Sequence, residues 1–313
     1  MNDVLSQTLS NAPDDFLRLL RALMHLHNAG ARQLDAARQE VQRLNTECGD
    51  GLAQAHRLGL VDSEDPEHLG FTALGKQVCD GVKQYVNWLD HADELPIGVR
   101  PEMVKGKEIL DVGCGVGCAL LTFGRHGAAG LTGADMMATF PAMARVFAAR
   151  QKLQAPLVVL ADGARLPFPD RSFDLVFCRL AINYMHSEDA LAEMARVARD
   201  GADLVICLNM LRWHMKTMRK QLSRLQWKGL AFDLFRMGNG LLLHTLHRQI
   251  TLSYAGQMFG THSPVWHTPW TMRRQLARWS FDCLWDNATE HADTPTFHAR
   301  RRPRETTMEH DHS

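Results

Sequence analysis

Hydrophobic positions in the first ninety residues recur three or four residues apart, which is the spacing of an α-helix. In the first helical stretch these positions are Phe16, Leu19, Leu20, Leu23, Met24 and Leu26, and Gly30 ends the run. A polar helix is predicted from there to about Asn45, and a last helix runs through Tyr85 and Trp88. The pattern predicts a helical N-terminal region with one short extended interruption.

The pattern changes near residue 105, where short apolar runs begin to alternate with helical stretches. Strands are predicted at 108–112, 130–134, 157–160, 173–178 and 202–208, and helices from Cys118, at about 138–152 and at about 188–198. Thr268-Pro269 is typical of a helix N-cap and first turn, and FDCLWD and TFHARR are predicted to be two closing strands. Strands that alternate with helices predict parallel βαβ units covered on both faces.

A linker is predicted between these two regions, because HADELPIGVRPEM contains two prolines and a glycine. We therefore expect a helical domain at residues 1–95 and an α/β domain at residues 96–302. Residues 209–267 are helical, apolar and basic, and they are too long for a plain loop, so a helical insertion is expected there. Residues 303–313 are expected to form a disordered tail.

Composition then narrows the class of protein. The chain has 45% hydrophobic and 22% charged residues, which is ordinary for a globular protein. Its seven cysteines are scattered without a CxxC pair, so neither a disulfide framework nor a metal site is expected. The start lacks a signal-peptide pattern, and no run of 18 apolar residues predicts a membrane-spanning helix. A cytoplasmic protein is expected.

Charge is unevenly distributed although Lys+Arg and Asp+Glu both number 35. Residues 209–281 contain eleven lysines and arginines but a single acid, Asp233. The first hundred residues lean towards acid. Such an asymmetry favours an anionic partner or membrane surface for the basic segment, or it marks a solvated helix face.

The stretch EILDVGCGVGCALL at residues 108–121 is the most informative motif. A predicted strand runs directly into three glycines and then a helix, so backbone N–H groups can approach a ligand without an intervening Cβ. The spacing is GxGxG, because Cys118 stands where the dinucleotide fingerprint GxGxxG needs its third glycine. No Lys-Ser/Thr pair follows, which excludes a P-loop. Cys114 and Cys118 are expected to be small packing residues of this loop.

This motif resembles the first motif of the class I S-adenosylmethionine (SAM) dependent methyltransferases. Asp135 follows the second predicted strand, where that family keeps an acid for the ribose hydroxyls. Asp162, followed by Gly163, comes after the third strand, where an acid of that family accepts a hydrogen bond from the adenine amino group. The phrase LPFPDRSFDLVFC is especially similar to methyltransferases related to ubiquinone and menaquinone biosynthesis. The resemblance covers about residues 105–208, and more weakly 269–302.

The resemblance also implies roles for the residues of the loop. Gly113, Gly115 and Gly117 would pack against the methionine portion of SAM, and Met136 would cover the adenine face. Asp111 would either orient the glycine loop or contact the cofactor directly, and both roles stay open.

Methyl transfer needs a general base only when the acceptor must lose a proton. Tyr184 and His186, after the fourth predicted strand, are the candidate catalytic residues, and His214, His262 and His267 are further candidates near the insertion. The insertion is expected to act as a lid with an apolar pocket wall, although a cap that only completes the core and a membrane-facing helix remain alternatives. The wall residues would be Trp213, Trp227, Phe232, Phe235, Met237, Leu241, Leu242, Leu243, Tyr254, Met258 and Phe259.

A short helix ending in LGLV, a turn and an FTALG step resemble a winged helix-turn-helix over about 60 residues. Its recognition segment offers only His56 and Arg57 to a phosphate or base, and its surroundings are acidic. DNA readers bring a basic surface to that helix, so we favour a dimerisation or substrate-cap module.

The sequence thus predicts a Rossmann-like, seven-stranded α/β SAM methyltransferase sheet with its last strand antiparallel, an N-terminal winged-helix-like domain and a helical lid. The expected function is methylation of a small, apolar or aromatic acceptor with SAM as cofactor and S-adenosylhomocysteine as product. A SAM-sensing DNA-binding regulator is the alternative. The expected partner is a small-molecule substrate; a homodimer and a peripheral membrane contact through residues 209–267 stay open as alternatives, with a soluble cap favoured over the membrane contact, and nucleic acid is not expected.

Overall fold

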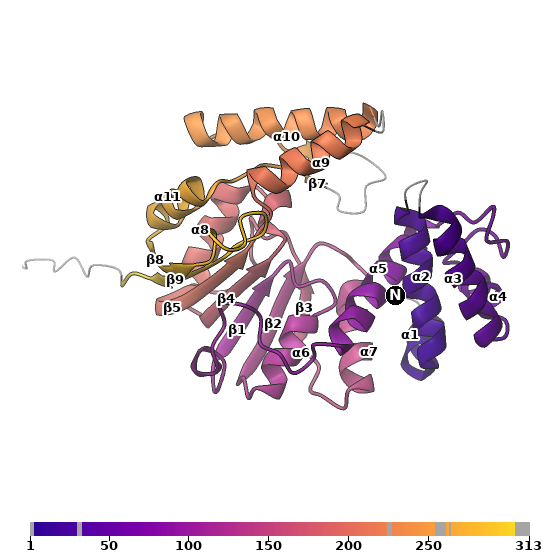
Figure 1. The fold of residues 1–313 in the computed structure, drawn as a ribbon. Coiled ribbons are helices and arrows are strands. Elements are labelled where there is room, and N and C mark those ends of the chain that lie inside the picture. Colours follow the sequence, from indigo (N-terminus) through magenta and orange to yellow (C-terminus); the bar gives the residue numbers. More distant parts are fainter. Residues whose placement is uncertain (1–2, 30–32, 224–226, 254–260, 263, 304–313) are drawn as a thin grey trace, which may run out of the picture.

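A seven-stranded sheet forms the centre of the chain (Figure 1). The computed structural model describes residues 3–29, 33–223, 227–253, 261–262 and 264–303. The strands lie in the order β3-β2-β1-β4-β5-β9-β8. Their bounds are β1 (Glu108–Val112), β2 (Gly130–Asp135), β3 (Leu157–Leu160), β4 (Phe173–Arg179), β5 (Ala198–Cys207), β8 (Phe281–Asp286) and β9 (Thr296–Arg301).

The sheet is parallel except for β9, which pairs antiparallel with both β5 and β8. The predicted Rossmann-like sheet with an antiparallel last strand is therefore confirmed. β5 begins four residues before its predicted start and continues through the turn at Asp200-Gly201, with a register shift against β4. The apolar run that predicted this strand covers only its second half, which explains the difference.

Helices cover both faces of the sheet, because the strands alternate their side chains between two cores. Leu110, Val176 and Leu204 pack on the side of α8 (Ser187–Val197) and α11 (Pro269–Arg278). The neighbouring strand positions pack on the side of α6 (Cys118–Arg125) and α7 (Phe140–Arg150), and they include Ile109, Leu175, Phe177 and Val205.

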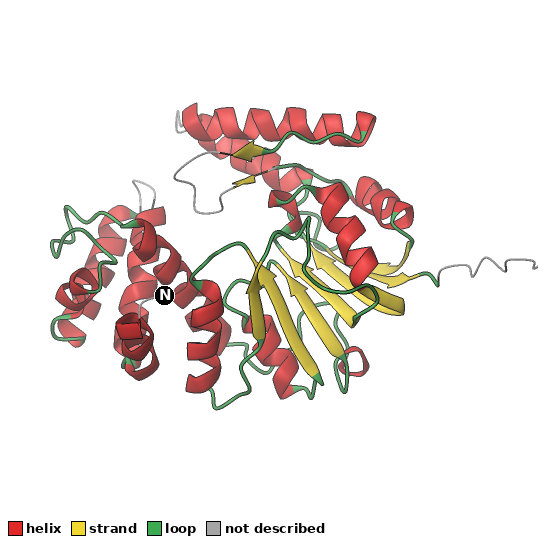
Figure 2. Cartoon of the chain, turned by 180° about the vertical axis from the view of Figure 1, so that it is seen from behind, coloured by secondary structure: helices red, strands yellow, loops and turns green. Residues whose placement is uncertain are grey.

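Five helices precede the sheet: α1 (Asp3–Asn11), α2 (Asp14–Asn28), α3 (Leu34–Glu47), α4 (Gly51–Arg57) and α5 (Ala73–Leu89). Figures 1 and 2 both place α1–α4 beyond the β3 edge of the sheet. These helices share one hydrophobic core with α6 and α7. Within it, the rings of Tyr85 and Phe147 stack with their centroids 4.1 Å apart. Arg150 of α7 also donates to the carbonyls of Leu9 and Ser10 at the end of α1 and to that of Ala12, which follows the helix.

The segment that resembles a winged helix contains α4, one isolated antiparallel bridge between Val61 and Phe71, and α5. Thr72 caps α5 by accepting a hydrogen bond from the backbone N–H of Gly75 at 2.8 Å. The winged-helix interpretation stays a prediction, as do the predicted domain boundaries.

The segment after β5 contains two helices, α9 (Leu211–Ser223) and α10 (Trp227–Leu246), and a short hairpin of β6 (Leu252–Ser253) and β7 (Thr261–His262). Asn239 of α10 donates to the carbonyls of Ile250 and Pro264, and its own carbonyl oxygen accepts from the Ile250 N–H at 2.7 Å. The returning chain is therefore tied along α10. Thr268 caps α11 with Pro269 in its first turn, as the sequence predicts.

Candidate functional site

A cavity of about 870 Å³ lies at the carboxyl ends of the central strands. Ligands of open α/β sheets bind at this edge, where loops from neighbouring strands converge. Nearly all of the site residues predicted from the sequence line this cavity: Asp111, Gly113, Gly115, Asp135, Met136, Asp162, Gly163, Tyr184 and His186.

The glycine loop between β1 and α6 forms the floor of the cavity. Gly113 and Gly115 have φ angles of 76° and 57°, in the left-handed region that favours glycine. A Cβ on Gly113 would lie 2.2 Å from the Cβ of Ala181, and one on Gly115 would lie 2.1 Å from Oε1 of Gln84. Both positions therefore favour glycine for conformation, and Gly113 also needs it for space, because the Ala181 Cβ cannot rotate away whereas the Gln84 amide can shift.

Gly117 has a different place from the other two glycines. It is the N-cap of α6 with a φ of 78°, and it is not among the residues that line the cavity. A Cβ at Gly117 would approach Pro156 Cγ at 3.3 Å, on the way to β3. The structure thus gives Gly117 a packing position behind the loop, and its predicted contact with a ligand stays a prediction.

Asp135 joins the ends of β1 and β2. One carboxylate oxygen accepts from the Gly115 N–H at 2.8 Å, and the other accepts from the Met137 N–H at 3.0 Å. Burial raises the pKa of this carboxyl, while the backbone hydrogen bonds act in the opposite direction. The side chain therefore holds the glycine loop in place and at the same time lines the cavity.

Asp111 is a buried carboxyl beneath the loop, 3% exposed. Burial raises its pKa to about 7, the nearby Arg179 guanidinium lowers it, and the Asp135 carboxylate raises it further. Arg179 ends β4 and lines the same cavity. Sequence reasoning missed Arg179, although its position directly after a buried strand of the sheet could have indicated it.

Asp162 begins the loop after β3. Its carboxylate accepts from the Ala164 N–H at 2.9 Å, so it shapes the turn that carries it into the cavity wall. Gly163 beside it is buried, and a Cβ there would lie 2.6 Å from Met185 Sδ. Gly163 therefore allows close packing between the loops after β3 and β4, because a Cβ there would displace the end of the Met185 side chain.

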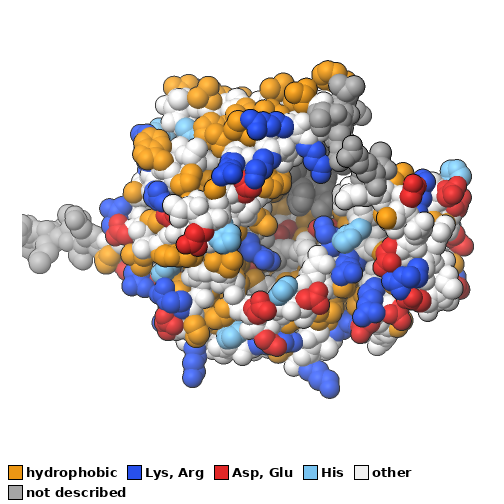
Figure 3. Space-filling view, in the orientation of Figure 1, with side chains coloured by type: hydrophobic (Ala, Val, Ile, Leu, Met, Phe, Trp, Pro, Cys, Tyr) orange, Lys and Arg blue, Asp and Glu red, His pale blue; other side chains and the backbone are white. Residues whose placement is uncertain are grey.

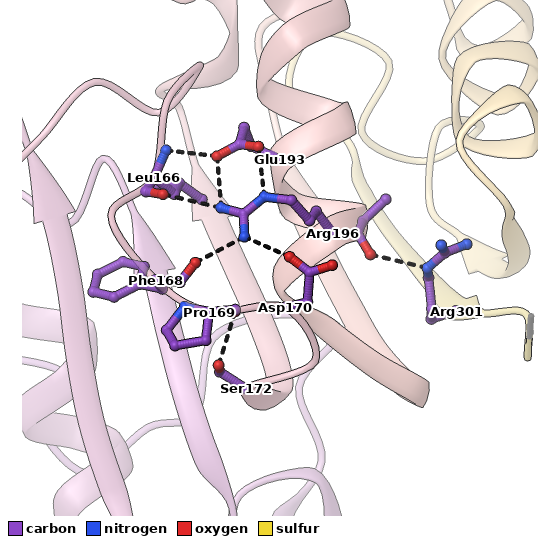
Figure 4. A network of polar contacts seen from close by, with 9 residues as sticks. Leu166, Phe168, Pro169, Asp170, Ser172, Glu193, Arg196 and Arg301 are labelled. Carbon is purple, nitrogen blue, oxygen red and sulfur yellow. Dashed lines mark hydrogen bonds and ion pairs between the residues drawn. The ribbon is translucent and has the colours of Figure 1, made fainter.

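The rest of this loop, which carries the phrase LPFPDRSF, is held by Arg196 of α8 (Figure 4). The Arg196 guanidinium donates to the carbonyls of Leu166 and Phe168 and to the carboxylate of Asp170. Glu193 completes the network, because it accepts from Arg196 and from the Leu166 N–H. This network of hydrogen bonds therefore fixes the loop after Asp162.

The two candidate catalytic residues lie on the cavity wall after β4. Tyr184 ends a short 3-10 helix, η2 (Ile182–Tyr184), and His186 is the N-cap residue of α8. Nδ1 of His186 lies 2.9 Å from a carboxylate oxygen of Asp189. An imidazole oriented in this way can present Nε2 to a ligand.

The further histidine candidates lie elsewhere. His214 and His267 are buried and do not line the cavity, and burial lowers the pKa of each to about 3. Both are therefore neutral core residues at physiological pH. The side chain of His262 lies outside the described residues. Burial raises the pKa of the Cys114 and Cys118 thiols, as expected of packing residues, and the described residues hold no cluster of potential metal ligands.

The N-terminal module was expected to serve dimerisation or to act as a substrate cap, and its helix α5 supplies part of the cavity wall. Asp80, Gln84, Asn87 and Trp88 of α5 line the cavity, and the following residues 91–97 contribute to it as well. Oε1 of Gln84 also accepts from the Val116 N–H at 3.4 Å, so α5 rests on the glycine loop. The helical pattern showed that α5 exists but could not show which element its polar face meets.

The insertion contributes less of the wall than expected. Among its described residues, only Thr251 lines the cavity. Trp227 and Leu241 of α10 face solvent, whereas Leu243 of the same helix is buried. Tyr254, Met258 and Phe259 lie outside the described residues. That the insertion acts as a lid stays a prediction.

The surface of α4 has little free positive charge. His56 lies 3.2 Å from Glu64, and Arg57 lies 3.6 Å from Asp50. Both candidate DNA contacts are thus neighboured by acids, which does not favour the DNA-binding alternative. Every helix in the described ranges is too short or too polar to cross a membrane.

Comparisons with known proteins agree with this geometry. The family model described as a methyltransferase domain matches residues 110–222. A demethylmenaquinone methyltransferase of Tropheryma whipplei is 38% identical over 105 residues, which cover 33% of this chain and 41% of that protein. A ubiquinone/menaquinone biosynthesis C-methyltransferase of Cupriavidus necator is 34% identical over 114 residues, 35% of this chain and 44% of that protein.

Among solved structures, an S-adenosylmethionine dependent methyltransferase from Mesorhizobium loti aligns with a TM-score of 0.42 at 18% identity, covering 64% of this chain and 93% of the other. The chain spans less than half the length of the two curated relatives described above. The matched residues contain the glycine loop, Asp135 and Asp162. Residues 110–222 therefore match a methyltransferase domain, and the sheet that carries them has the Rossmann-like arrangement of a SAM methyltransferase fold.

Proposed function

We propose that the protein transfers a methyl group from SAM to a small, apolar or aromatic acceptor bound in the 870 Å³ cavity. The observation that carries this proposal is the convergence of the glycine loop, Asp135 and Asp162 on one cavity that also has an apolar wall. The backbone of Gly113 and Gly115 lines this cavity directly after β1, where N–H groups can approach a ligand, and this fits SAM.

The charge of the cavity also fits SAM. Among the described residues, five carboxylic acids line it, Asp80, Glu94, Asp111, Asp135 and Asp162, against a single arginine, Arg179, and no lysine. A cavity rich in acids suits a ligand that carries a sulfonium and an ammonium group. When bound, SAM supplies a methyl group that its sulfonium already activates.

In this proposal the chain mainly binds and orients. Asp135 would accept from the ribose hydroxyls while it holds Gly115, and Asp162 would accept from the adenine amino group. Gly113 and Gly115 would lie against the methionine portion, and Met136 against the adenine ring. Positioning of this kind accounts for up to about 7–11 kcal/mol of a reaction barrier.

The remaining wall favours an apolar acceptor. Its side chains come from α5, the loop after α5 and the loop after β4, and they are Trp88, Leu95, Pro96, Ile97, Leu180, Tyr184 and Met185. Such a surface binds a hydrophobic or aromatic molecule and excludes water from the site of transfer. We infer that α5 caps this acceptor, and this is the role we assign to the N-terminal helices.

We propose His186 as the general base for an acceptor that must lose a proton. Its imidazole lies beside the Asp189 carboxylate on the cavity wall, and Tyr184 would help to position the acceptor. His186→Gln is expected to lower kcat at least tenfold with little change in KM, and to remove the acidic limb of the pH profile. An unchanged pH profile in this variant would show that His186 holds no proton in the reaction.

The direct test is transfer of a radiolabelled methyl group from SAM to a panel of phenols, quinols and hydrophobic amines. We expect labelled product from at least one apolar or aromatic acceptor, and at least tenfold less from Asp135→Asn at subsaturating SAM. Transfer only to strongly polar acceptors, or to none of the panel in protein that binds SAM, would contradict the proposed acceptor class.

A further inference from the structure

The outer face of α10 is apolar, although the helix lies on the surface. Trp227, Leu234 and Leu241 are seven residues apart, and their side chains are 66%, 59% and 57% exposed. The other exposed positions between Trp227 and Leu241 are Ala231 and Gly238, so among the described side chains no charge interrupts this line. We call the line from Trp227 to Leu241 the α10 stripe.

The inner face of α10 is polar, which inverts the usual arrangement of a surface helix. Asp233 and Arg236 are buried and form an ion pair at 2.5 Å, and Arg236 also donates to His214 at 3.1 Å. Asn239 is buried on the same side. Contiguous exposed apolar surface of this kind marks a binding surface, because single scattered residues are the normal case.

Basic side chains accompany the α10 stripe. Figure 3 shows hydrophobic side chains along the top of the molecule over α10 and Lys and Arg side chains just beneath, over α9. Arg212 and Lys216 share one acid, Asp293, and Arg219 has no ion pair among the described residues. The only acid between residues 209 and 281 is the buried Asp233, so this surface carries excess positive charge.

A tryptophan of α11, beside the C-terminal end of α10, has an arginine over its ring. Trp270 of α11 is 65% exposed, and the Arg274 guanidinium lies 5.5 Å from its ring centroid. Both line a cavity of about 320 Å³ that also includes His244 of α10 and His247, which follows that helix. Tryptophan beside a cation is typical of surfaces that meet a membrane interface.

We propose that the α10 stripe and the bases beside it dock the protein onto an anionic lipid bilayer, with α10 lying in the plane of the interface. An apolar line flanked by cations matches acyl chains beneath anionic headgroups. A second copy of this chain fits less well, because a symmetric interface on α10 would bring two basic α9 helices together. One helix pair would also bury less area than a stable dimer needs.

Co-sedimentation with vesicles tests this proposal on the full chain. We expect binding to vesicles of phosphatidylcholine with phosphatidylglycerol, weakening as salt rises, and little binding to phosphatidylcholine alone. Replacing Leu234 and Leu241 together by Gln should lower the bound fraction at least tenfold. Replacing Arg219 and Arg274 by Gln should also lower it and flatten its salt dependence. Leu284→Gln changes a 52% exposed leucine on β8 and is the matched control, with no loss expected.

Light scattering of the same variants, and their thermal stabilisation by SAM, complete the test. A chain that binds no anionic vesicles, or whose double leucine variant binds as the wild type does, overturns the proposal. A wild-type dimer that becomes monomeric in the leucine variant and ignores vesicles would assign the stripe to a second copy instead. Thermal stabilisation by SAM reports on the other cavity, so failure of membrane docking is distinguishable from failure of the proposed methyl transfer.

Discussion

Gly113→Ala is the substitution in the glycine loop that we expect to be most destabilising. The backbone there has a φ of 76°, and an L-residue in that region costs about 1–2 kcal/mol. The new Cβ would lie 2.2 Å from the Cβ of Ala181, which cannot rotate away because it is fixed to the backbone after β4. Moving these two Cβ atoms apart strains the packing around them, which costs roughly 1–3 kcal/mol more.

The free energy of unfolding of Gly113→Ala should therefore fall by about 2–5 kcal/mol, the sum of these two costs. The loop must also move away from Ala181, and the cavity floor moves with it. The affinity for SAM should then fall at least tenfold, which corresponds to about 1.4 kcal/mol. Urea unfolding and calorimetric titration with SAM measure the two quantities.

Gly106→Ala is the matched control. Its φ is 70°, but no atom lies within 4 Å of the added Cβ, and it precedes β1 at the opposite end of that strand from the cavity. This variant should lose only the conformational part, about 1–2 kcal/mol, and keep its affinity for SAM. If Gly113→Ala bound SAM as tightly as the control, the loop would not form the floor of the binding site.

Three further predictions concern buried charge. Asp135→Asn should weaken SAM binding by about 1.5–3 kcal/mol in calorimetric titration, because a charged acceptor is lost, and unchanged affinity would mean that the ribose acid is misplaced. Asp111→Asn should stabilise the chain more at pH 8 than at pH 4 in urea unfolding. The reason is that burial raises the pKa of Asp111 from 3.8 to about 7, so the wild type loses stability as the pH rises through that window. The same dependence of the unfolding free energy on pH in both proteins would contradict this. His267→Gln should lessen the loss of stability as the pH falls from 6.5 towards 3. Burial lowers the pKa of His267 to about 3, so in the wild type the unfolded state takes up this proton before the folded state does. An identical acid transition in both proteins would show that His267 is accessible to solvent.

Much of the sheet was predictable because its strands are continuous apolar runs bounded by glycine and charged residues. The predicted bounds of 108–112 and 157–160 match β1 and β3. The glycine loop and the acids after β2 and β3 were predictable for a related reason. A parallel sheet brings the carboxyl ends of adjacent strands to one edge, so residues distant in sequence are expected to meet there.

The partners of the N-terminal helices were not predictable in the same way. The periodicity of α5 shows that one face is buried, but it does not identify the element on which that face packs. Gln84 reaches the glycine loop across 32 residues of sequence, and no local pattern encodes that contact. The linker-like prolines and glycine after α5 suggested separation, whereas α1–α5 share a core with α6 and α7.

The prediction that the insertion is helical is confirmed. Some of its apolar residues, however, were expected to face a pocket and instead face solvent. Trp227 and Leu241 were expected to line a pocket, and they are exposed on the outer face of α10. Hydrophobicity alone does not distinguish a pocket wall from an exposed binding surface. The sequence could have indicated the inversion, because Asp233, Arg236 and Asn239 recur at helical spacing on the opposite face.

Calorimetric titration of the folded chain with S-adenosylhomocysteine tests the central claim most directly, because it requires no knowledge of the acceptor. The account predicts saturable binding at one site per chain, competition with SAM, and at least tenfold weaker binding to Gly113→Ala than to Gly106→Ala. Absence of binding to a chain that unfolds cooperatively, or equal binding to both glycine variants, would contradict the assignment of the cavity at the carboxyl ends of β1 and β2 as the SAM site.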